Sequence, residues 1–170
     1  MKINVQNLKD GTHVFDFCVE RGELDELDLG QHEIYRAPIF VESTVDKRGL
    51  NIVVTSRVRT VGDFECDVCL SHFAREVEDE FRVLYTYESA LVEADHDEMV
   101  QLLSGNSHEI DLRFGVRDSL LLAVPIKVKC SEECKGLCPH CGANLNEGAC
   151  ACERAEIDPR WEQLRKLASV

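Results

Sequence analysis

Cysteine is the residue type in this chain whose spacing most clearly indicates a chemistry. The chain has nine cysteines. Cys66 and Cys69 form a CxxC pair, and six more follow between residues 130 and 152. Within that run the string CPHCG at residues 138–142 has the form of a zinc knuckle, in which two thiolates two residues apart point at one ion. The glycine permits the turn that aims backbone N–H groups at sulfur.

A single knuckle supplies two ligands, whereas tetrahedral zinc takes four. Cys150 and Cys152 are the nearest downstream pair. Cys130 and Cys134 could serve instead, or could combine with the first CxxC pair. Apart from Cys18, the thiols suffice for two sites of four, one local to the C-terminal segment and one joining it to the first pair. The sequence thus predicts one zinc ion, or two, with ligands drawn from Cys66, Cys69, Cys130, Cys134, Cys138, Cys141, Cys150 and Cys152.

Redox chemistry and disulfides are the main alternatives for these thiols. A thioredoxin-like CxxC opens a helix after a strand, whereas Cys66 precedes a polar segment that leads to another strand. The N-terminus has neither the apolar stretch nor the cleavage site of a secretory signal, so we expect a cytoplasmic protein with reduced thiols. Cys18, in a strand-like run, is expected to be a small buried apolar residue. His140 is expected at the surface.

Composition limits the possible partners. The chain has 170 residues, 44% of them hydrophobic, which suits one globular domain, or one domain with a small satellite. It carries 19 Lys and Arg against 32 Asp and Glu, for a formal net charge of -13. A broad clamp on a phosphate backbone needs clustered cations, so that mode of binding is disfavoured. No apolar run is long enough to span a membrane.

The elements that must position the first CxxC pair are β-strands. A short strand is expected around Val14, Phe15 and Phe17 after a turn at Gly11. Residues 34–45 and 50–60 are β-branched runs separated by a turn at 46–49, which predicts a hairpin. Pro38 indicates an edge strand or a bulge in its first arm. The buried face of the second arm is expected to hold Leu50, Ile52, Val54 and Val58.

A second hairpin is predicted from residues 61–65 and 73–87, with the CxxC pair at its tip. Residues 88–109 are acidic and suit a solvated loop with one helical turn near 99–103. A carboxylate metal site at His96 is the less favoured alternative there. A helix follows over about residues 111–124, with Asp111 as its N-cap and Pro125 after its end.

The last segment needs something other than an apolar core to order it, because residues 126–156 hold few large apolar side chains. A short terminal helix is expected from Asp158 and Pro159 onward. The predicted class is α+β. An antiparallel β-rich domain with its packing helix covers 1–125, and a unit of the zinc-knuckle segment plus the terminal helix covers 126–170.

Several strings occur here in an order that matches a known family. They are CDVCL at 66–70, LLLAVP at 120–125, CKGLCPHCGANLN at 134–146, CAC at 150–152 and DPR at 158–160. With them the chain resembles the bacterial and plastid YceD family, which is linked to accumulation of large-subunit (23S) ribosomal RNA. The resemblance implies a cytoplasmic factor in large-subunit synthesis, processing or assembly, without established catalytic residues. Some members lack the C-terminal string, which favours zinc as a structural element and allows the first CxxC pair a separate role.

Three classes of function follow. The first is a non-enzymatic factor that binds a ribosomal protein or another assembly factor, since an acidic chain suits a basic partner. The second is direct contact with precursor large-subunit rRNA through a local basic patch. The third, an enzyme, is disfavoured because a four-cysteine site leaves zinc no open position for water. We expect the first, with neither a membrane nor a small-molecule partner. Candidate cations for the second are Arg57, Arg59, Lys127, Lys129, Lys135, Arg154, Arg160, Arg165 and Lys166.

Overall fold

The computed structural model describes residues 1–20, 34–35, 38–89, 100–105 and 107–152. Its main element is a five-stranded sheet in the order β2-β3-β4-β5-β6, antiparallel except for the parallel pair β5–β6. The strands are β2 (Gly11–Val19), β3 (Ile39–Arg48), β4 (Asn51–Glu65), β5 (His72–Thr86) and β6 (Val100–Leu102). A second sheet pairs β1 (Lys2–Asn4) with β7 (Glu109–Asp111), and one helix, α2 (Arg113–Leu122), follows. The predicted mixture of antiparallel sheet, one packing helix and a Cys-rich segment is confirmed in outline.

One face of the large sheet is buried and the other is open. Along β3 and β4 buried and exposed residues alternate, as period-2 side-chain placement requires. Ile52, Val54 and Val58 lie on the buried face, as predicted, but Leu50 lies in the turn and is exposed. That turn is shorter than predicted, because residues 46–48 continue β3 in register with residues 51–53.

Pro38 lies just before β3, which is an interior strand between β2 and β4, so the prediction of an edge or bulge is wrong. Proline before the first strand residue leaves the ladder of N–H donors intact. Cys18 is exposed rather than buried. It pairs with Phe40 on the open face, whereas the next pair along the strands, Val19 and Ile39, points to the buried face.

Two apolar clusters cover the buried face. The first lies under α2, where Val116 and Leu120 pack on Val41 and Val58. The Tyr35 hydroxyl donates a hydrogen bond to the Leu120 carbonyl at 2.7 Å. The second cluster lies under the small sheet and contains the following buried residues: Ile3, Val5, Val45, Ile52, Val54, Tyr85, Leu103, Ile110 and Leu112.

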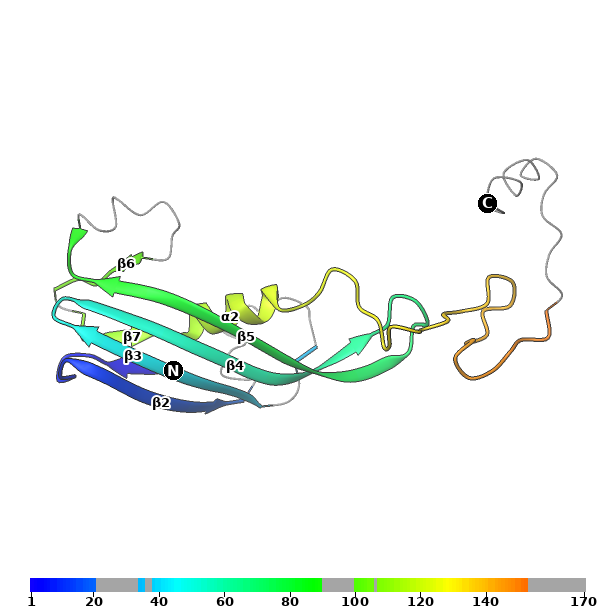
Figure 1. The fold of residues 1–170 in the computed structure, drawn as a ribbon, viewed down its shortest axis with the longest axis horizontal. Helices are drawn as coiled ribbons and strands as arrows, with labels where there is room; N and C mark the ends of the chain where they lie inside the picture. The colour runs from blue at the N-terminus through cyan, green and yellow to red at the C-terminus, as the bar shows by residue number, and fades with distance from the viewer. Residues whose placement is uncertain (21–33, 36–37, 90–99, 106, 153–170) are drawn as a thin grey trace.

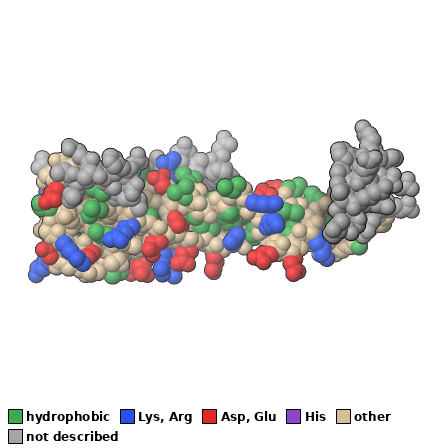
Figure 2. Space-filling model, turned by 45° about the horizontal axis from the view of Figure 1, so that its top comes forward, with side chains coloured by type: hydrophobic (Ala, Val, Ile, Leu, Met, Phe, Trp, Pro, Cys, Tyr) green, Lys and Arg blue, Asp and Glu red, His purple; other side chains and the backbone are tan. Residues whose placement is uncertain are grey.

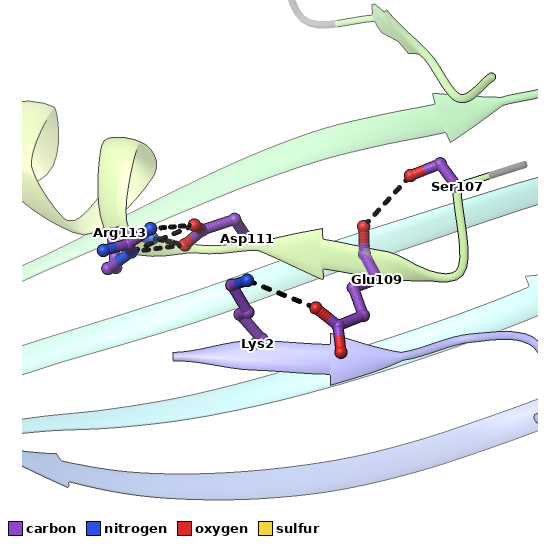
Figure 3. Close-up of polar contacts among 5 residues, drawn as sticks. All are labelled: Lys2, Ser107, Glu109, Asp111 and Arg113. Atoms are coloured by element: carbon purple, nitrogen blue, oxygen red, sulfur yellow. Dashed lines mark hydrogen bonds and ion pairs between the residues drawn. The ribbon is translucent and has the colours of Figure 1, made fainter.

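The corner between β7 and α2 is held by polar contacts (Figure 3). Lys2 Nζ lies 3.3 Å from a Glu109 carboxylate oxygen across β1 and β7. Asp111 accepts hydrogen bonds from the Arg113 side chain and from its backbone N–H. Partial burial opposes ionisation of Asp111, but these bonds lower its pKa. The N-cap of α2 is Leu112 instead of the predicted Asp111. The Asp111 carboxylate nevertheless accepts a hydrogen bond from the first N–H of the helix, that of Arg113.

The region between β5 and β7 differs from its prediction. Residues 100–102 form β6 instead of a helical turn, since they pair with residues 84–86 at the end of β5. The helix ends at Leu122, earlier than the predicted 124. The acidic residues around His96 and the predicted terminal helix after Asp158 lie outside the described residues. No helix within the described ranges is long and apolar enough to cross a membrane.

The hairpin of β4 and β5 is much longer than the rest of the sheet and extends toward the Cys-rich segment (Figure 1). The ladder between β3 and β4 ends at Phe40 and Arg59, whereas β4 and β5 stay paired as far as Glu65 and His72. The CxxC pair lies at the tip of this hairpin, as predicted. The sheet thus holds the first two cysteines at one end of the molecule.

Candidate metal centre

Eight of the nine cysteines come together in two groups of four. The tip group consists of Cys66, Cys69, Cys130 and Cys134. The C-terminal group consists of Cys138, Cys141, Cys150 and Cys152. Within each group the four sulfur atoms lie within 4.8 Å of one another. Of the partitions that the spacing allows, the structure thus has the one in which the hairpin tip shares a group with Cys130 and Cys134.

The distances between sulfur atoms suit a tetrahedral ion. Zinc–sulfur bonds of about 2.3 Å give a tetrahedron with edges of about 3.8 Å. The Cys66–Cys134 and Cys69–Cys130 sulfur atoms are 3.8 and 3.6 Å apart, and those of Cys138 and Cys150 are 3.4 Å apart. A disulfide would require about 2.05 Å, and all nine cysteines are free. Each group could therefore hold one metal ion.

The two CxxC segments adopt the same backbone turn. In the hairpin tip, Leu70 N–H donates to the Cys66 carbonyl at 2.8 Å, and Cys66 N–H donates to the Ser71 carbonyl at 3.0 Å. In the C-terminal group, Gly142 N–H donates to the Cys138 carbonyl at 2.9 Å, and Cys138 N–H donates to the residue 143 carbonyl at 2.8 Å. Both groups are thus built on a zinc-knuckle turn.

Leu70 occupies the position that glycine has in the second knuckle. Its φ is 57°, beside 73° for Gly142, so both residues have left-handed backbone conformations. Glycine adopts this conformation without steric cost, whereas for leucine it costs roughly 1–2 kcal/mol. In the sequence only CPHCG has the form of a knuckle, because CDVCL lacks the glycine that signals the turn.

The segment after α2 brings the second pair of ligands to the hairpin tip. Asp67 N–H donates to the Val128 carbonyl at 2.9 Å, and Val128 N–H donates to the Asp67 carboxylate at 2.6 Å. These two bonds hold residue 128 beside the tip, and Cys130 N–H then donates to the Cys66 sulfur at 3.4 Å. The tip group therefore joins the sheet to the C-terminal segment.

Hydrogen bonds to sulfur favour thiolates in both groups, since they lower the pKa of Cys66 and Cys134 in the tip group and of Cys138 in the C-terminal group. Burial opposes ionisation of the Cys66 thiol, but backbone N–H groups, that of Cys130 foremost, lower its pKa to about 6. The backbone N–H groups of Cys141 and His140 lower the pKa of Cys138 to about 6. His140 itself is exposed, as predicted, and contributes through its backbone.

One thiol in each group has a raised pKa and keeps its proton. A hydrogen bond with the Cys134 sulfur, followed by one with Cys69, raises the pKa of Cys130 to about 12. A hydrogen bond with the Cys141 sulfur likewise raises the pKa of Cys152 to about 12. Metal ligands must be deprotonated, so an ion entering either group displaces these protons, and metal binding weakens as the pH falls.

Two asparagines connect the two groups. The Asn146 side-chain amide donates to the Cys134 sulfur at 3.4 Å, and its carbonyl oxygen accepts Lys135 N–H at 2.8 Å. The Asn144 amide donates to the Ser71 hydroxyl at 3.2 Å. Both asparagines lie in the loop between the cysteine pairs of the C-terminal group. The loop of one group thus supplies a hydrogen bond to a ligand of the other.

Replacing Asn146 by alanine is expected to weaken metal binding at the tip group. Loss of a hydrogen bond to a metal ligand typically costs ten- to a hundredfold in affinity. Competition with a coloured chelator would measure the affinity of each site, with Asn7→Ala, an exposed asparagine in the N-terminal part, as the matched control. Equal affinities in Asn146→Ala and the parent protein would contradict a role for Asn146 in the tip group.

The arrangement defines a class of protein: a β-sheet protein whose hairpin tip and C-terminal segment are joined by paired cysteine-knuckle centres. The family model described as "Large ribosomal RNA subunit accumulation protein YceD" matches residues 54–168. The matched region contains both groups and most of the β4–β5 hairpin. The chain therefore belongs to the YceD family.

Individual relatives extend this likeness. An uncharacterized protein of Mycobacterium bovis is 30% identical over 152 residues, which are 88% of this chain and 65% of that protein. The chloroplastic YCED homolog 1 of Arabidopsis thaliana is 42% identical over 59 residues, 35% of this chain and 18% of that protein. The chloroplastic YCED homolog 1 of Zea mays is 26% identical over 149 residues, 72% of this chain and 51% of that protein. The chain thus spans less than two thirds of the length of these relatives. No solved structure matches the chain.

Proposed function

We propose that this chain is a non-enzymatic, cytoplasmic factor for biogenesis of the large ribosomal subunit. It supports accumulation or processing of 23S rRNA by binding an assembly partner, a ribosomal protein or another assembly factor. Membership of the YceD family, whose model is described by large ribosomal RNA subunit accumulation, supports the process. The observation that favours a binding function over a catalytic one is that eight thiols are gathered in two groups of four.

Each group is proposed to hold one zinc ion. Four thiolates are the donor set that structural zinc sites prefer, and the spacing between sulfur atoms suits them. Four sulfur ligands leave no position for a reactive water, so such an ion stabilises the fold and performs no hydrolysis. The free energy of metal binding then contributes to the folding of the C-terminal segment.

The partner is proposed to bind the open face of the large sheet, opposite α2. A hollow of about 720 Å³ lies there across β3, β4 and β5. Phe40 and Val61 line it and are 52% and 40% exposed. Glu76 and Glu78 lie on its β5 side. The hollow therefore offers an apolar anchor position with carboxylates beside it.

The charge of this face suits a basic partner. Two of its arginines are paired: Arg57 lies 3.3 and 3.5 Å from carboxylate oxygens of Glu78 and Glu80, and Arg59 lies 4.0 Å from Glu42. Carboxylates without a described ion pair remain on the same face, among them Asp16, Asp63 and Glu76. In the view of Figure 2, Lys and Arg side chains are scattered among Asp and Glu along the molecule. Opposite charge would speed encounter with a basic ribosomal protein.

The test uses proteins extracted from purified large ribosomal subunits, with the full chain loaded with zinc. We expect the chain to retain one or more of these basic proteins, and Phe40→Ser with Val61→Ser to lose that binding. Val14→Ser is the matched control, because Val14 is even more exposed on this sheet, at 61%, but does not line the hollow. In cells that lack the chain, the parent and control should restore 23S rRNA and the double variant should not. Restoration by the double variant equal to that by the parent would refute the proposed surface.

A further inference from the structure

A basic groove lies beside the tip group, away from the open face. It has a volume of about 560 Å³ and runs between the beginning of β5 and residues 127–132. Arg75, Lys127 and Lys129 line it, with Glu132 as the acidic side chain in its lining. Phe73, half-buried, lines it as well. Three cations and one aromatic ring thus converge on one groove in a strongly acidic chain.

The cations of the groove have no ion-pair partner among the described residues, unlike Arg57 and Arg59 of the open face. Arg57, Arg59 and Arg113 all lie within 4.0 Å of a carboxylate oxygen. Acidic residues outnumber basic ones, 32 to 19, so carboxylate partners are plentiful along this chain. Cations left without one, gathered in one groove, are available for an external anion.

Fold geometry separates this groove from the hollow on the open face. Arg75 and Glu76 are neighbours in β5, and successive strand residues point to opposite faces. Arg75 accordingly lies on the face that α2 covers, beside Ala123 and Pro125 after the end of the helix. Lys127 and Lys129 flank Val128, whose backbone N–H and carbonyl both form hydrogen bonds with Asp67 at the hairpin tip. The three cations are therefore held by two fixed segments.

We propose that this groove binds single-stranded RNA, with phosphates on Arg75, Lys127 and Lys129 and a base against Phe73. Lysine and arginine supply the phosphate contacts in RNA-binding proteins, and an aromatic ring stacks on any base. The inference rests on the proposed function only in taking RNA as the polyanion. Together with the open face, it makes the chain a connector between an RNA segment and a basic protein.

Charge balance for the thiolates is the competing role for these cations, because Cys130 also lines the groove. The donors to sulfur in the tip group are backbone N–H groups, among them that of Cys130, and the Asn146 side-chain amide. Within the described residues no lysine or arginine donates a hydrogen bond to these sulfurs. The cations thus remain free to contact phosphate.

The test measures binding of a fluorescent single-stranded RNA of about a dozen nucleotides by the zinc-loaded full chain. Three phosphate contacts predict a slope of about -2 in log affinity against log salt, which is a loss of about 15-fold from 50 to 200 mM salt. The variant Arg75→Gln, Lys127→Gln, Lys129→Gln should lose most of the affinity and of the slope. The control Lys2→Gln, Lys9→Gln, Arg48→Gln removes the same charge at the other end of the sheet.

Three results would overturn the inference. They are no RNA binding by the parent chain at about 50 mM salt, equal loss of affinity in both triple variants, or displacement of the RNA by an equal charge of oligoglutamate. If the groove variant lost its zinc, the role of the three cations would be to balance the charge of the thiolates. That result would also count against RNA binding. The groove variant could fail to bind RNA and still restore 23S rRNA in cells. That result would refute the RNA site but would leave the proposed function unaffected.

Discussion

Removing metal with a chelator is expected to unfold residues 126–152 and to leave the large sheet folded. Cys138 is the one apolar residue of this segment that is buried within the described residues, so the segment has little apolar packing of its own. Structural zinc in small peptides contributes on the order of 10–16 kcal/mol, and that contribution would be lost entirely. The sheet keeps two apolar clusters that contain none of the eight grouped cysteines. Hydrogen exchange followed by mass spectrometry would resolve the two regions.

Single cysteine variants test the two sites separately. The parent chain is expected to carry two zinc ions by elemental analysis, and Cys66→Ser and Cys138→Ser one each. Cys18→Ser is the matched control, because the Cys18 thiol is exposed and belongs to neither group, so it should keep both ions. One ion in the parent chain, or unchanged protection of residues 126–152 after chelation, would contradict the two-site structure.

The sequence predicted the long strands β2 to β5, because each carries its own pattern, but not the short strands β1, β6 and β7. The alternation of apolar residues correctly predicted the buried face of β4. The segment between two strand-like runs correctly predicted the hairpin tip at Cys66. The errors fall where long-range pairing decides. Residues 100–102 became a strand because they meet the end of β5. Cys18 became exposed because the register of β2 with β3 sets which face it occupies.

The candidate ligands could be named from spacing, but their grouping could not be chosen. Spacing allowed Cys130 and Cys134 to join either remaining pair, and the choice depends on Val128 lying beside Asp67, a contact between distant parts of the chain. The first knuckle could not be recognised from the sequence, because Leu70 occupies the position where a knuckle usually has glycine. Asn146 carried no recognisable signal of its own, because its role exists only once both groups have formed.

Replacing Leu120 by alanine is expected to destabilise the sheet domain by about 2–5 kcal/mol, the usual cost of truncating a buried leucine. Leu120 is 1% exposed and packs in the cluster under α2, and its carbonyl accepts the Tyr35 hydroxyl. Leu122→Ala is the matched control on the same helix, because Leu122 is 82% exposed. Its cost should stay within about 0.5 kcal/mol. Urea unfolding followed by circular dichroism would measure both.

The same titration separates the two centres, because they depend on the sheet to different extents. The tip group takes Cys66 and Cys69 from the β4–β5 hairpin, so unfolding of the sheet should release its ion. All four cysteines of the C-terminal group lie within residues 138–152, so that group can keep its ion when the sheet is unfolded. In Leu120→Ala one zinc should therefore be released at lower urea than in the parent, while release of the second should not shift. A shift of both together would show that the C-terminal group depends on the sheet through Asn144 and Asn146, the two side chains that join them.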